Sequence, residues 1–284
     1  MIPQPPSNTV LDVRGLTKQF PAGSAFKRQH VHALNAATFS VSESEVVALV
    51  GESGSGKSTT ARLIARLMPP TAGEIYFDGR DVLKAEPGKA SLAYRRQVQM
   101  IFQDPFGSLN PVHSIGHHIE RPLRIHKAAG KPQERVLELL KTVGLTPAAD
   151  FYHRFPHELS GGQRQRVAIA RALAVDPRII LADEPISMLD VSIRMGVLNL
   201  MARLKEERRI GFLYITHDLA SARYIGDRTI VMYAGHMVES ASSTEMMDAP
   251  AHPYTQLLMS AVPNPRAGVD RTVQARGEVP SLVD

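Results

Sequence analysis

Cysteine and tryptophan are both absent from the 284 residues of this chain. Without cysteine the protein has no disulfide, no thiolate zinc site, no cysteine-bound iron–sulfur cluster and no cysteine nucleophile. Long apolar runs are also missing, since no stretch approaches the roughly 18 residues that a membrane-spanning helix needs. The first ten residues, MIPQPPSNTV, lack the basic segment and apolar stretch of a secretory signal. We therefore expect a protein that stays in the cytosol.

The overall composition is that of an ordinary globular protein. Apolar residues make up 43% of the chain and charged residues 21%, which is unlike a disordered protein. Its length allows one large domain or two closely packed lobes around a buried core. The formal charge is +5, and an excess of basic residues of this size usually reflects only a solvated surface. Nucleic-acid binding needs a basic patch, and since the sequence shows none, no nucleic-acid partner is expected.

Short apolar runs predict the strands of a buried parallel sheet. VVALV at residues 46–50 is continuous and rich in β-branched residues, as in a strand covered on both faces. A glycine-rich turn follows, and residues 58–68 then repeat apolar side chains at helical spacing until Pro69 and Pro70. Similar runs at residues 178–182, 211–215 and 229–233 are the other candidate core strands.

The middle and the end of the chain follow other patterns. Between residues 105 and 157 the buried-strand runs disappear, and amphipathic segments such as ERVLELLKTV at residues 134–143 take their place. We expect an inserted helical lobe there. After Val262 the sequence has little periodicity, and the last forty or so residues are rich in Pro, Ala, Gly and Ser, which predicts an extended tail.

Residues 51–58 form a motif that binds polyphosphate. GESGSGKS satisfies the pattern G-x-x-x-x-G-K-[ST] and stands between a predicted strand and a predicted helix, as the motif requires. Its glycines let successive N–H groups turn inward, and the helix N-terminus adds partial positive charge. We expect Lys57 to reach the β- and γ-phosphates and the Ser58 hydroxyl to bind Mg²⁺. The other nucleotide-binding candidates in and beside this loop are Gly51, Ser53, Gly54, Ser55, Gly56 and Thr59. Alone, the loop indicates an NTPase, a class that includes GTPases, kinases, helicases and motors.

Two carboxylates follow another predicted strand. RIILADE places Asp183 and Glu184 at the carboxyl end of an apolar run, where ligands gather in open α/β sheets. Asp183 suits Mg²⁺, and Glu184 is the candidate to polarise the attacking water, because phosphoryl transfer needs an oriented nucleophile. The alternative is a strand capped by two solvated carboxylates, which the phosphate loop makes the weaker interpretation.

A third segment, LSGGQ at residues 159–163, resembles the signature motif of ABC ATPases. LSGGQ at residues 159–163 is followed by RQRVAIARAL, and a serine with two glycines at the start of a helix makes a second anion site. A plain N-capped helix is the alternative. The resemblance implies that Ser160, Gly161, Gly162 and Gln163 close over ATP held by a partner subunit, in a head-to-tail dimer.

Four more residues match the family pattern in order. Gln103 in IFQDP resembles the Q-loop glutamine, which contacts Mg²⁺ or water and senses the membrane subunit. His217 in YITHD resembles the switch histidine, which contacts the γ-phosphate, and Asp190 in SMLD resembles the D-loop aspartate, although the family more often has alanine at the position of Met188. Phe20 in LTKQF is the best match to the aromatic residue that stacks on adenine, and a core phenylalanine is the alternative.

The resemblance also implies the architecture. It predicts an α/β fold with a P-loop NTPase (RecA-like) core around a parallel sheet, an N-terminal antiparallel β subdomain and an inserted α-helical subdomain. Residues 10–104 and 164–243 would form the core with its antiparallel subdomain, residues 105–163 the helical signature subdomain, and residues 244–284 a C-terminal extension.

Further segments are similar to the dipeptide and oligopeptide importer ATPases. These segments are GESGSGKST, FQDPFGSLNP, GGQRQRVAIARAL, DEPISMLDVS and HPYTQLLMSAVP. The likeness implies a second, identical or different, ABC ATPase subunit, two integral-membrane permeases and an extracytoplasmic substrate-binding protein, with this chain peripheral on the cytoplasmic face of the inner membrane. ATP and Mg²⁺ are the expected cofactors. The subfamily also includes nickel, glutathione and oligosaccharide importers, so the cargo stays open. Relatives often continue past a GE-x-P-S segment into a cysteine-bearing tail that can hold an iron–sulfur cluster, whereas here GEVPS is followed by Leu282 to Asp284, so we expect no such cluster.

Alternatives from other classes are a non-transport ABC ATPase, associated with nucleic acid or translation, and a nucleotide-dependent switch without turnover. Non-transport ABC ATPases have cysteine-rich zinc modules, long coiled-coil insertions or tandem cassettes, and this sequence shows none of them. The presence of both Glu184 and His217 argues against a switch without turnover. One further cluster consists of His113, His117, His118 and His126. A solvated helical face is a better interpretation of that cluster than a metal site.

Overall fold

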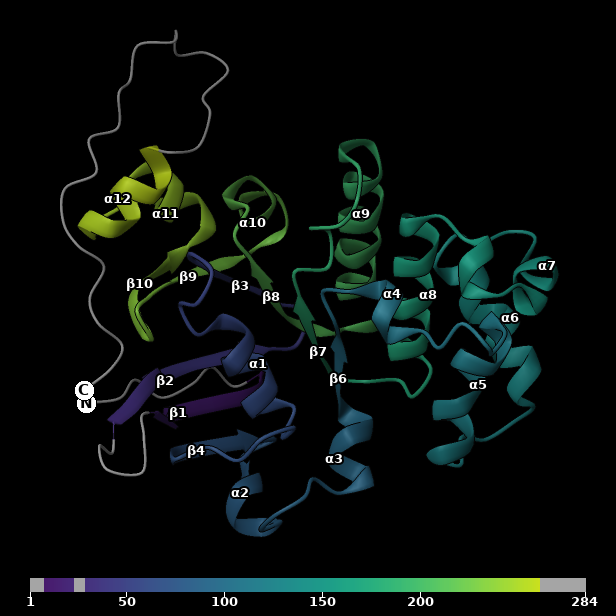
Figure 1. Cartoon of the computed structure of the whole chain (residues 1–284), viewed down its shortest axis with the longest axis horizontal. Helices are drawn as coiled ribbons and strands as arrows, with labels where there is room; N and C mark the ends of the chain where they lie inside the picture. The colour runs from purple at the N-terminus through teal and green to yellow at the C-terminus, as the bar shows by residue number, and fades with distance from the viewer. Residues whose placement is uncertain (1–7, 23–28, 261–284) are drawn as a thin grey trace, which may run out of the picture.

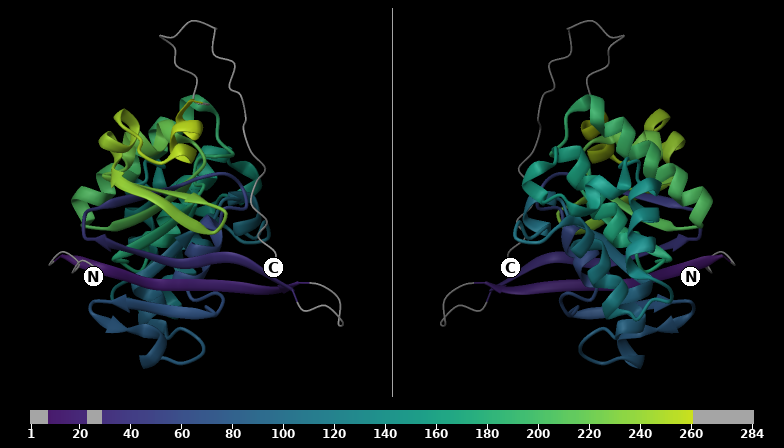
Figure 2. Two further views of the ribbon diagram at one scale, coloured as in Figure 1. Left: turned by 90° about the vertical axis from the view of Figure 1, so that its left-hand side faces the viewer. Right: turned by 90° about the vertical axis from the view of Figure 1, so that its right-hand side faces the viewer.

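The computed structural model describes residues 8–22 and 29–260, which form two sheets and a group of helices (Figure 1). The smaller sheet pairs its strands antiparallel in the order β2-β1-β4-β5. Its members are β1 (Thr9–Ala22), β2 (Gln29–Ser42), β4 (Ala72–Phe77) and β5 (Arg80–Asp81). The long pair of β1 and β2 crosses the whole molecule in the views of Figure 2.

The larger sheet has the order β10-β9-β3-β8-β7-β6. Its members are β3 (Val46–Val50), β6 (Val98–Ile101), β7 (Ile179–Asp183), β8 (Gly211–Thr216), β9 (Arg228–Tyr233) and β10 (His236–Ser242). All neighbours from β9 to β6 are parallel, and only β10 runs antiparallel to its neighbour β9. The carboxyl ends of the five parallel strands therefore share one edge of the sheet.

The central strands are buried on both faces, as their continuous apolar runs predict. In β3, Val46, Ala48 and Val50 belong to one hydrophobic core, whereas Val47 and Leu49 belong to a second core on the opposite face. Successive side chains of a strand point to opposite faces, so one apolar run feeds both cores. The second core contains α1 (Lys57–Ile64) and the smaller sheet, and the first core contains most of the helices.

The helical lobe lies beyond β6 and β7, at the right of Figure 1. It contains α4 (Pro105–Ser108), α5 (Ile115–Ile125), α6 (Pro132–Thr142), α7 (Ala148–His153), a 3₁₀ turn (Pro156–Glu158) and α8 (Gly161–Leu173). The remaining helices are α2 (Val82–Ala85), α3 (Leu92–Gln97), α9 (Val191–Arg208), α10 (Leu219–Ile225), α11 (Ser243–Asp248) and α12 (Pro253–Ser260). None of the helices within residues 8–22 and 29–260 combines the length and apolar character that crossing a bilayer requires.

The helix after the phosphate loop is shorter than its sequence predicts. Apolar spacing extends the helix to Met68, but α1 ends at Ile64. Arg66 adopts a φ of 53°, a left-handed conformation that ends helices. Its guanidinium donates to the carbonyl of Val82 and to the carboxylate of Glu86, and these bonds hold the chain in a turn.

Two helices near the end of the described chain were not predicted. α11 and α12 span six and eight residues, too short for apolar periodicity to reveal them. Both lie beside β9 and β10, at the left of Figure 1. The extended tail expected after Val262 lies outside the described residues.

Candidate active site

The residues that the sequence singles out for phosphate chemistry gather where the parallel strands end. Gly51 follows β3, Gln103 follows β6, Asp183 ends β7 and His217 follows β8. Because the carboxyl ends of neighbouring parallel strands meet at one edge, these residues reach the same side of the sheet. This edge is the candidate active site.

The backbone of the phosphate loop, residues 51–58, requires glycine at two positions. Gly51 has a φ of 148°, and a Cβ there would lie 2.2 Å from the carbonyl oxygen of Met232 at the end of β9. Gly56 has a φ of 103°, and its Cβ would lie 2.4 Å from the carbonyl oxygen of Ala33 in β2. The loop is thus pressed between both sheets, which only residues without a Cβ permit. Ser53 and Gly54 are exposed at its tip, whereas Ser58 and Thr59 are half-buried at the start of α1.

Lys57 is buried inside the loop that precedes it. Its Nζ donates to the carbonyls of Gly51 and Glu52, at 2.7 and 2.6 Å, and lies 3.3 Å from the Ser55 hydroxyl. Burial lowers the pKa of Lys57, while the nearby carboxylates, Glu184 first among them, oppose this shift. The three N–H groups of the ammonium therefore all have acceptors, and a phosphate bound on the loop would replace one of them.

Two oxygen groups meet beside Lys57. The Ser58 hydroxyl donates to Asp183 Oδ1 at 2.8 Å, and the Asp183 side chain is almost fully buried. Burial raises the pKa of Asp183, against the hydrogen bond from Ser58, which favours the ionised form. A hydroxyl and a carboxylate in contact are ligands of the kind that Mg²⁺ prefers.

Glu184 lies at the centre of a three-residue network. Its Oε2 accepts from Gln103 Nε2 at 2.9 Å, and its Oε1 lies 3.1 Å from His217 Nδ1. Its φ of 46° is a left-handed conformation that costs a non-glycine residue energy and is typical of functional sites. The Glu184 N–H donates to the carbonyl of Ile215 in β8, which fixes this conformation. A carboxylate oriented in this way is suited to accept a proton from water.

The LSGGQ segment lies in another part of the molecule. α8 packs on α4, α5, α6, α9 and β6, whereas the phosphate loop lies between β3 and α1 (Figure 1). Ser160 caps α8 by accepting from Gln163 N–H at 3.3 Å, and Gln163 Oε1 accepts from Ser160 N–H at 3.0 Å. This capping box leaves the Ser160 side chain exposed at the helix N-terminus.

The signature helix is packed tightly against the D-loop segment. A Cβ on Gly162 would lie 2.4 Å from Cγ2 of Ile193, in the first turn of α9, whereas a Cβ on Gly161 would meet nothing closer than 3.6 Å. Asp190 is the exposed N-cap residue of α9, and its side chain makes no capping hydrogen bond. The N-termini of α8 and α9 therefore lie side by side.

Phe20 lies in β1, opposite Val31 of β2. It is half-buried, and the ammonium of Lys18 lies 5.1 Å from its ring centroid. Ala33, two residues along β2 from Val31, is the residue whose carbonyl packs against Gly56. Phe20 is thus on the strand pair that borders the phosphate loop, as an adenine-stacking residue requires.

Sequence patterns missed Tyr254, which bonds directly to the phosphate loop. Its hydroxyl accepts from the Glu52 N–H at 3.3 Å across 202 positions of sequence. No spacing pattern links residues so far apart, so only the fold reveals this contact.

The four histidines of the helical lobe do not form a metal site. The rings of His113 and His117 stack at 4.1 Å, and His118 Nε2 bonds the carbonyl oxygen of Asn110. Burial lowers the pKa of His118, which favours the neutral ring. Within the part of the chain that the structure describes, no three His, Cys, Asp or Glu side chains are arranged to hold a metal ion.

Comparison with protein families identifies the chain. Residues 34–187 match the family model of the ABC transporter, and residues 238–284 match the C-terminal region of oligopeptide/dipeptide transporters. The chain belongs to the ABC transporter family. The family membership and the ATPase activity that the LSGGQ motif predicted are thereby confirmed.

Members of the ABC transporter family resemble this chain over most of its length. The oligopeptide transport ATP-binding protein AppF of Bacillus subtilis is 46% identical, over 96% of this chain and 85% of the relative. The dipeptide transport ATP-binding protein DppF of Escherichia coli is 42% identical, over 96% and 82%. A solved dimeric structure of the ATP-binding cassette MJ0796, in a post-hydrolysis state bound to ADP and Pi, is 32% identical in sequence with a TM-score of 0.71. The alignment covers 82% of this chain and 98% of the MJ0796 chain. The predicted P-loop NTPase fold is thus confirmed.

Proposed function

We propose that this chain energises an importer of dipeptides or oligopeptides, as a peripheral subunit on the cytoplasmic face of the inner membrane. The match of residues 238–284 to the C-terminal region of oligopeptide/dipeptide transporters is the observation that carries the cargo class. The peptide-transport relatives, similar over nearly the whole chain, support it. The chemistry of the site supports the ATPase half of the proposal independently.

In this proposal the phosphate loop binds the polyphosphate of ATP. Its N–H groups and the Lys57 ammonium neutralise phosphate charge, and Phe20 stacks on the base. The Ser58 hydroxyl and the Asp183 carboxylate would hold Mg²⁺, which supplies charge neutralisation of the phosphates when bound. The residues fit such an ion, because the Ser58 hydroxyl oxygen lies 2.8 Å from Oδ1 of the buried Asp183 carboxylate.

Glu184 is the proposed general base. It would orient the attacking water in line with the γ-phosphate and accept its proton. Gln103 and His217 hold the two oxygens of its carboxylate, so they set the direction in which it acts. In the closed state His217 would also contact the γ-phosphate.

The second half of each site would come from a partner ATPase subunit. Ser160, Gly161, Gly162 and Gln163 cannot complete the site of their own chain, because they lie in the helical lobe rather than beside the loop. The exposed N-terminus of α8 suits the phosphates of a nucleotide held by another copy or by a related chain. The dimeric structure of the similar cassette supports this arrangement, and Asp190 would lie at the same interface.

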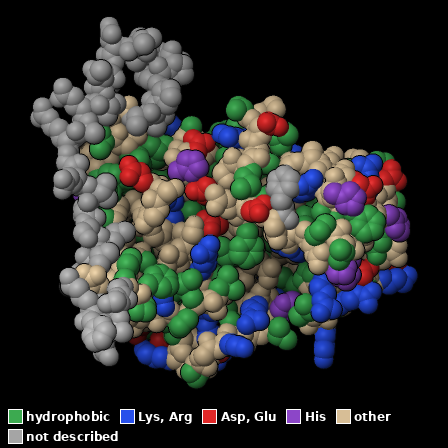
Figure 3. Space-filling model, in the orientation of Figure 1, with side chains coloured by type: hydrophobic (Ala, Val, Ile, Leu, Met, Phe, Trp, Pro, Cys, Tyr) green, Lys and Arg blue, Asp and Glu red, His purple; other side chains and the backbone are tan. Residues whose placement is uncertain are grey.

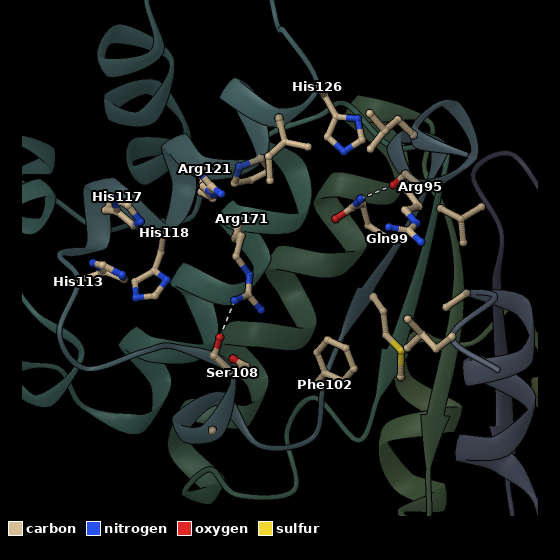
Figure 4. Close-up of a pocket in the computed structure, with 18 of the residues that line it drawn as sticks. Arg95, Gln99, Phe102, Ser108, His113, His117, His118, Arg121, His126 and Arg171 are labelled. Carbon is tan, nitrogen blue, oxygen red and sulfur yellow. Dashed lines mark hydrogen bonds between the residues drawn. The ribbon is translucent and has the colours of Figure 1, made fainter. Parts of the chain in front are cut away.

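A groove beside Gln103 is the proposed docking site of a permease (Figure 4). Its volume is about 1050 Å³, and Phe102 and Asp104, the neighbours of Gln103, both line it. Leu92, Phe102 and Ile125 expose 54, 39 and 44% of their surface there, which suits the apolar face of a helix. Basic side chains complete the wall, and Figure 3 shows basic and histidine side chains over the helical lobe.

A substitution in the groove tests whether permease docking there is coupled to ATP hydrolysis. Phe102→Asp should reduce the stimulation of ATPase activity by transported peptide in the membrane complex, because it places a charge where an apolar helix docks. ATP binding by the chain should not change. Val112→Asp is the matched control, since Val112 is 70% exposed and outside the groove. Equal stimulation in both variants would contradict docking at this groove.

Purification of the native complex tests the function as a whole. We expect two permeases to copurify, and mass spectrometry of the substrate-binding protein's ligand should identify peptides. Glutathione, nickel or an oligosaccharide as the bound ligand would contradict the assignment to dipeptides or oligopeptides. The proposed role as a transporter ATPase would still hold. Recovery without any membrane partner would support a non-transport ABC ATPase.

A further inference from the structure

The helix α12 contacts the phosphate loop through a buried tyrosine. Tyr254 is only 8% exposed, and its hydroxyl accepts from the backbone N–H of Glu52 at 3.3 Å. Its ring packs against Tyr233, the last residue of β9, with 4.2 Å between the ring centroids. This contact restricts the position of the hydroxyl, because a ring packed against the end of β9 has less freedom to move.

The peptide unit that Tyr254 contacts, between Gly51 and Glu52, is one of the two that hold Lys57. Lys57 Nζ donates to the carbonyls of Gly51 and Glu52, so Glu52 bonds Tyr254 through its N–H and Lys57 through its carbonyl. The backbone of β9 packs directly against Gly51, because a Cβ on Gly51 would lie 2.2 Å from the Met232 carbonyl oxygen. The first turn of the loop is therefore held between β9 and α12.

The start of α12 is itself anchored to the larger sheet. Glu239 of β10 accepts from the N–H groups of Ala251 and His252, at 2.8 and 3.0 Å, with one carboxylate oxygen for each. The N–H of Tyr254 in turn donates to His252 Nδ1 at 3.1 Å. A continuous path of hydrogen bonds thus runs from β10 through α12 to Glu52. Figure 1 shows α12 beside β10 and β9.

We propose that Tyr254 is a positioning residue for the phosphate loop, and that α12 thereby contributes to nucleotide affinity. By holding the Glu52 N–H, Tyr254 orders the first turn of the loop and, through the Glu52 carbonyl, the Lys57 ammonium. A loop ordered before binding avoids the entropic cost of ordering when ATP arrives. The inference rests on the proposed nucleotide site, and it assigns Tyr254 no contact with the nucleotide.

Tyr254→Phe in the full-length chain tests this role, since it removes the hydroxyl and keeps the stacked ring. Loss of one net hydrogen bond should weaken MgADP binding about fivefold in calorimetry. The KM for ATP should rise by a similar factor, while kcat changes less than about twofold. Tyr233→Phe is the matched control, because it removes the hydroxyl of the other stacked ring and leaves the bond to Glu52 in place.

Amide hydrogen exchange gives a readout that does not depend on activity. Exchange at the Glu52 amide of the nucleotide-free chain should be faster in Tyr254→Phe than in Tyr233→Phe or the wild type. If Tyr254→Phe does not fold, Glu239→Gln replaces it: an amide has a single oxygen for two N–H groups, so α12 is loosened with Tyr254 unchanged.

Two results would overturn the positioning role. One is unchanged MgADP affinity and Glu52 exchange in Tyr254→Phe. The other is a fall in kcat with KM unchanged, which would place Tyr254 in a later step. Failure of the underlying nucleotide site is distinguishable, because the wild-type chain would then bind no MgADP at all.

Discussion

Alanine at two adjacent glycines of the signature helix should have opposite effects on stability. At Gly161 the new Cβ has ordinary van der Waals space, with its nearest neighbour, a methyl of Leu189, at 3.6 Å. At Gly162 it would lie 2.4 Å from Cγ2 of Ile193, about 1 Å inside the 3.4 Å at which ordinary contact begins. That methyl is not the end of a flexible chain, because a β-branched side chain in a helix has one strongly preferred χ1.

The magnitudes follow from these contacts. Replacing glycine by alanine in a helix gains at most about 0.5–1 kcal/mol of stability, and less in the first turn. Overpacking costs about 1–3 kcal/mol. We therefore expect Gly161→Ala to be neutral or slightly stabilising, and Gly162→Ala to lose about 1–2 kcal/mol net. For a chain of this size that loss lowers the melting temperature by about 2–6 °C.

A double-mutant cycle measured by thermal and denaturant unfolding checks the cause. Ile193→Ala removes the methyl that the new Cβ would meet, so in that background Gly162→Ala should cost much less. The coupling free energy should exceed about 1 kcal/mol, as for residues in direct contact. Equal stability of the Gly161 and Gly162 variants, or a cycle without coupling, would refute the close contact between α8 and α9.

Two further predictions concern the site and its support. Glu184→Gln should lower the rate of phosphate release from ATP by about 10²–10⁴-fold, as for loss of a general base, while MgADP still binds. Glu207→Gln, on an exposed turn of α9, is the control. Wild-type turnover in Glu184→Gln would contradict the assignment. Burial would raise the pKa of Glu239, but the pKa is lowered because the N–H groups of Ala251 and His252 donate to the carboxylate. The stabilisation is thus present above the unfolded pKa of about 4.3 and lost as pH falls through the folded value. The melting temperature of Glu239→Gln should lie below that of the wild type at pH 7, and the gap should close near pH 3; a gap constant with pH would contradict this.

Some elements follow directly from the sequence, because one local pattern determines them. β3 spans the residues that VVALV predicts, and β7, β8 and β9 match their apolar runs to within one residue at each end. Short continuous apolar runs of this kind are typical of strands buried on both faces. The parallel order then brings Asp183 and His217 to one edge, whereas Gln103 follows β6, a strand that the apolar runs did not predict.

Other features depend on contacts between distant segments. α1 stops at Ile64 because the Arg66 guanidinium finds partners at Val82 and Glu86, which the spacing of apolar residues does not encode. Tyr254 reaches Glu52 because β10 and α12 bring the end of the described chain back to the loop. The bonds of Glu184 to two neighbouring strand ends likewise need side-chain geometry that only the fold supplies.

The network around Glu184 suggests how docking and hydrolysis are linked. Each oxygen of the proposed base has one partner, Gln103 or His217, and each oxygen can still accept a hydrogen bond from a water. Phe102, the residue before Gln103, lies in the wall of the groove. In the proposed docking, a permease helix that presses on Phe102 would shift Gln103, and with it the direction of the Glu184 carboxylate.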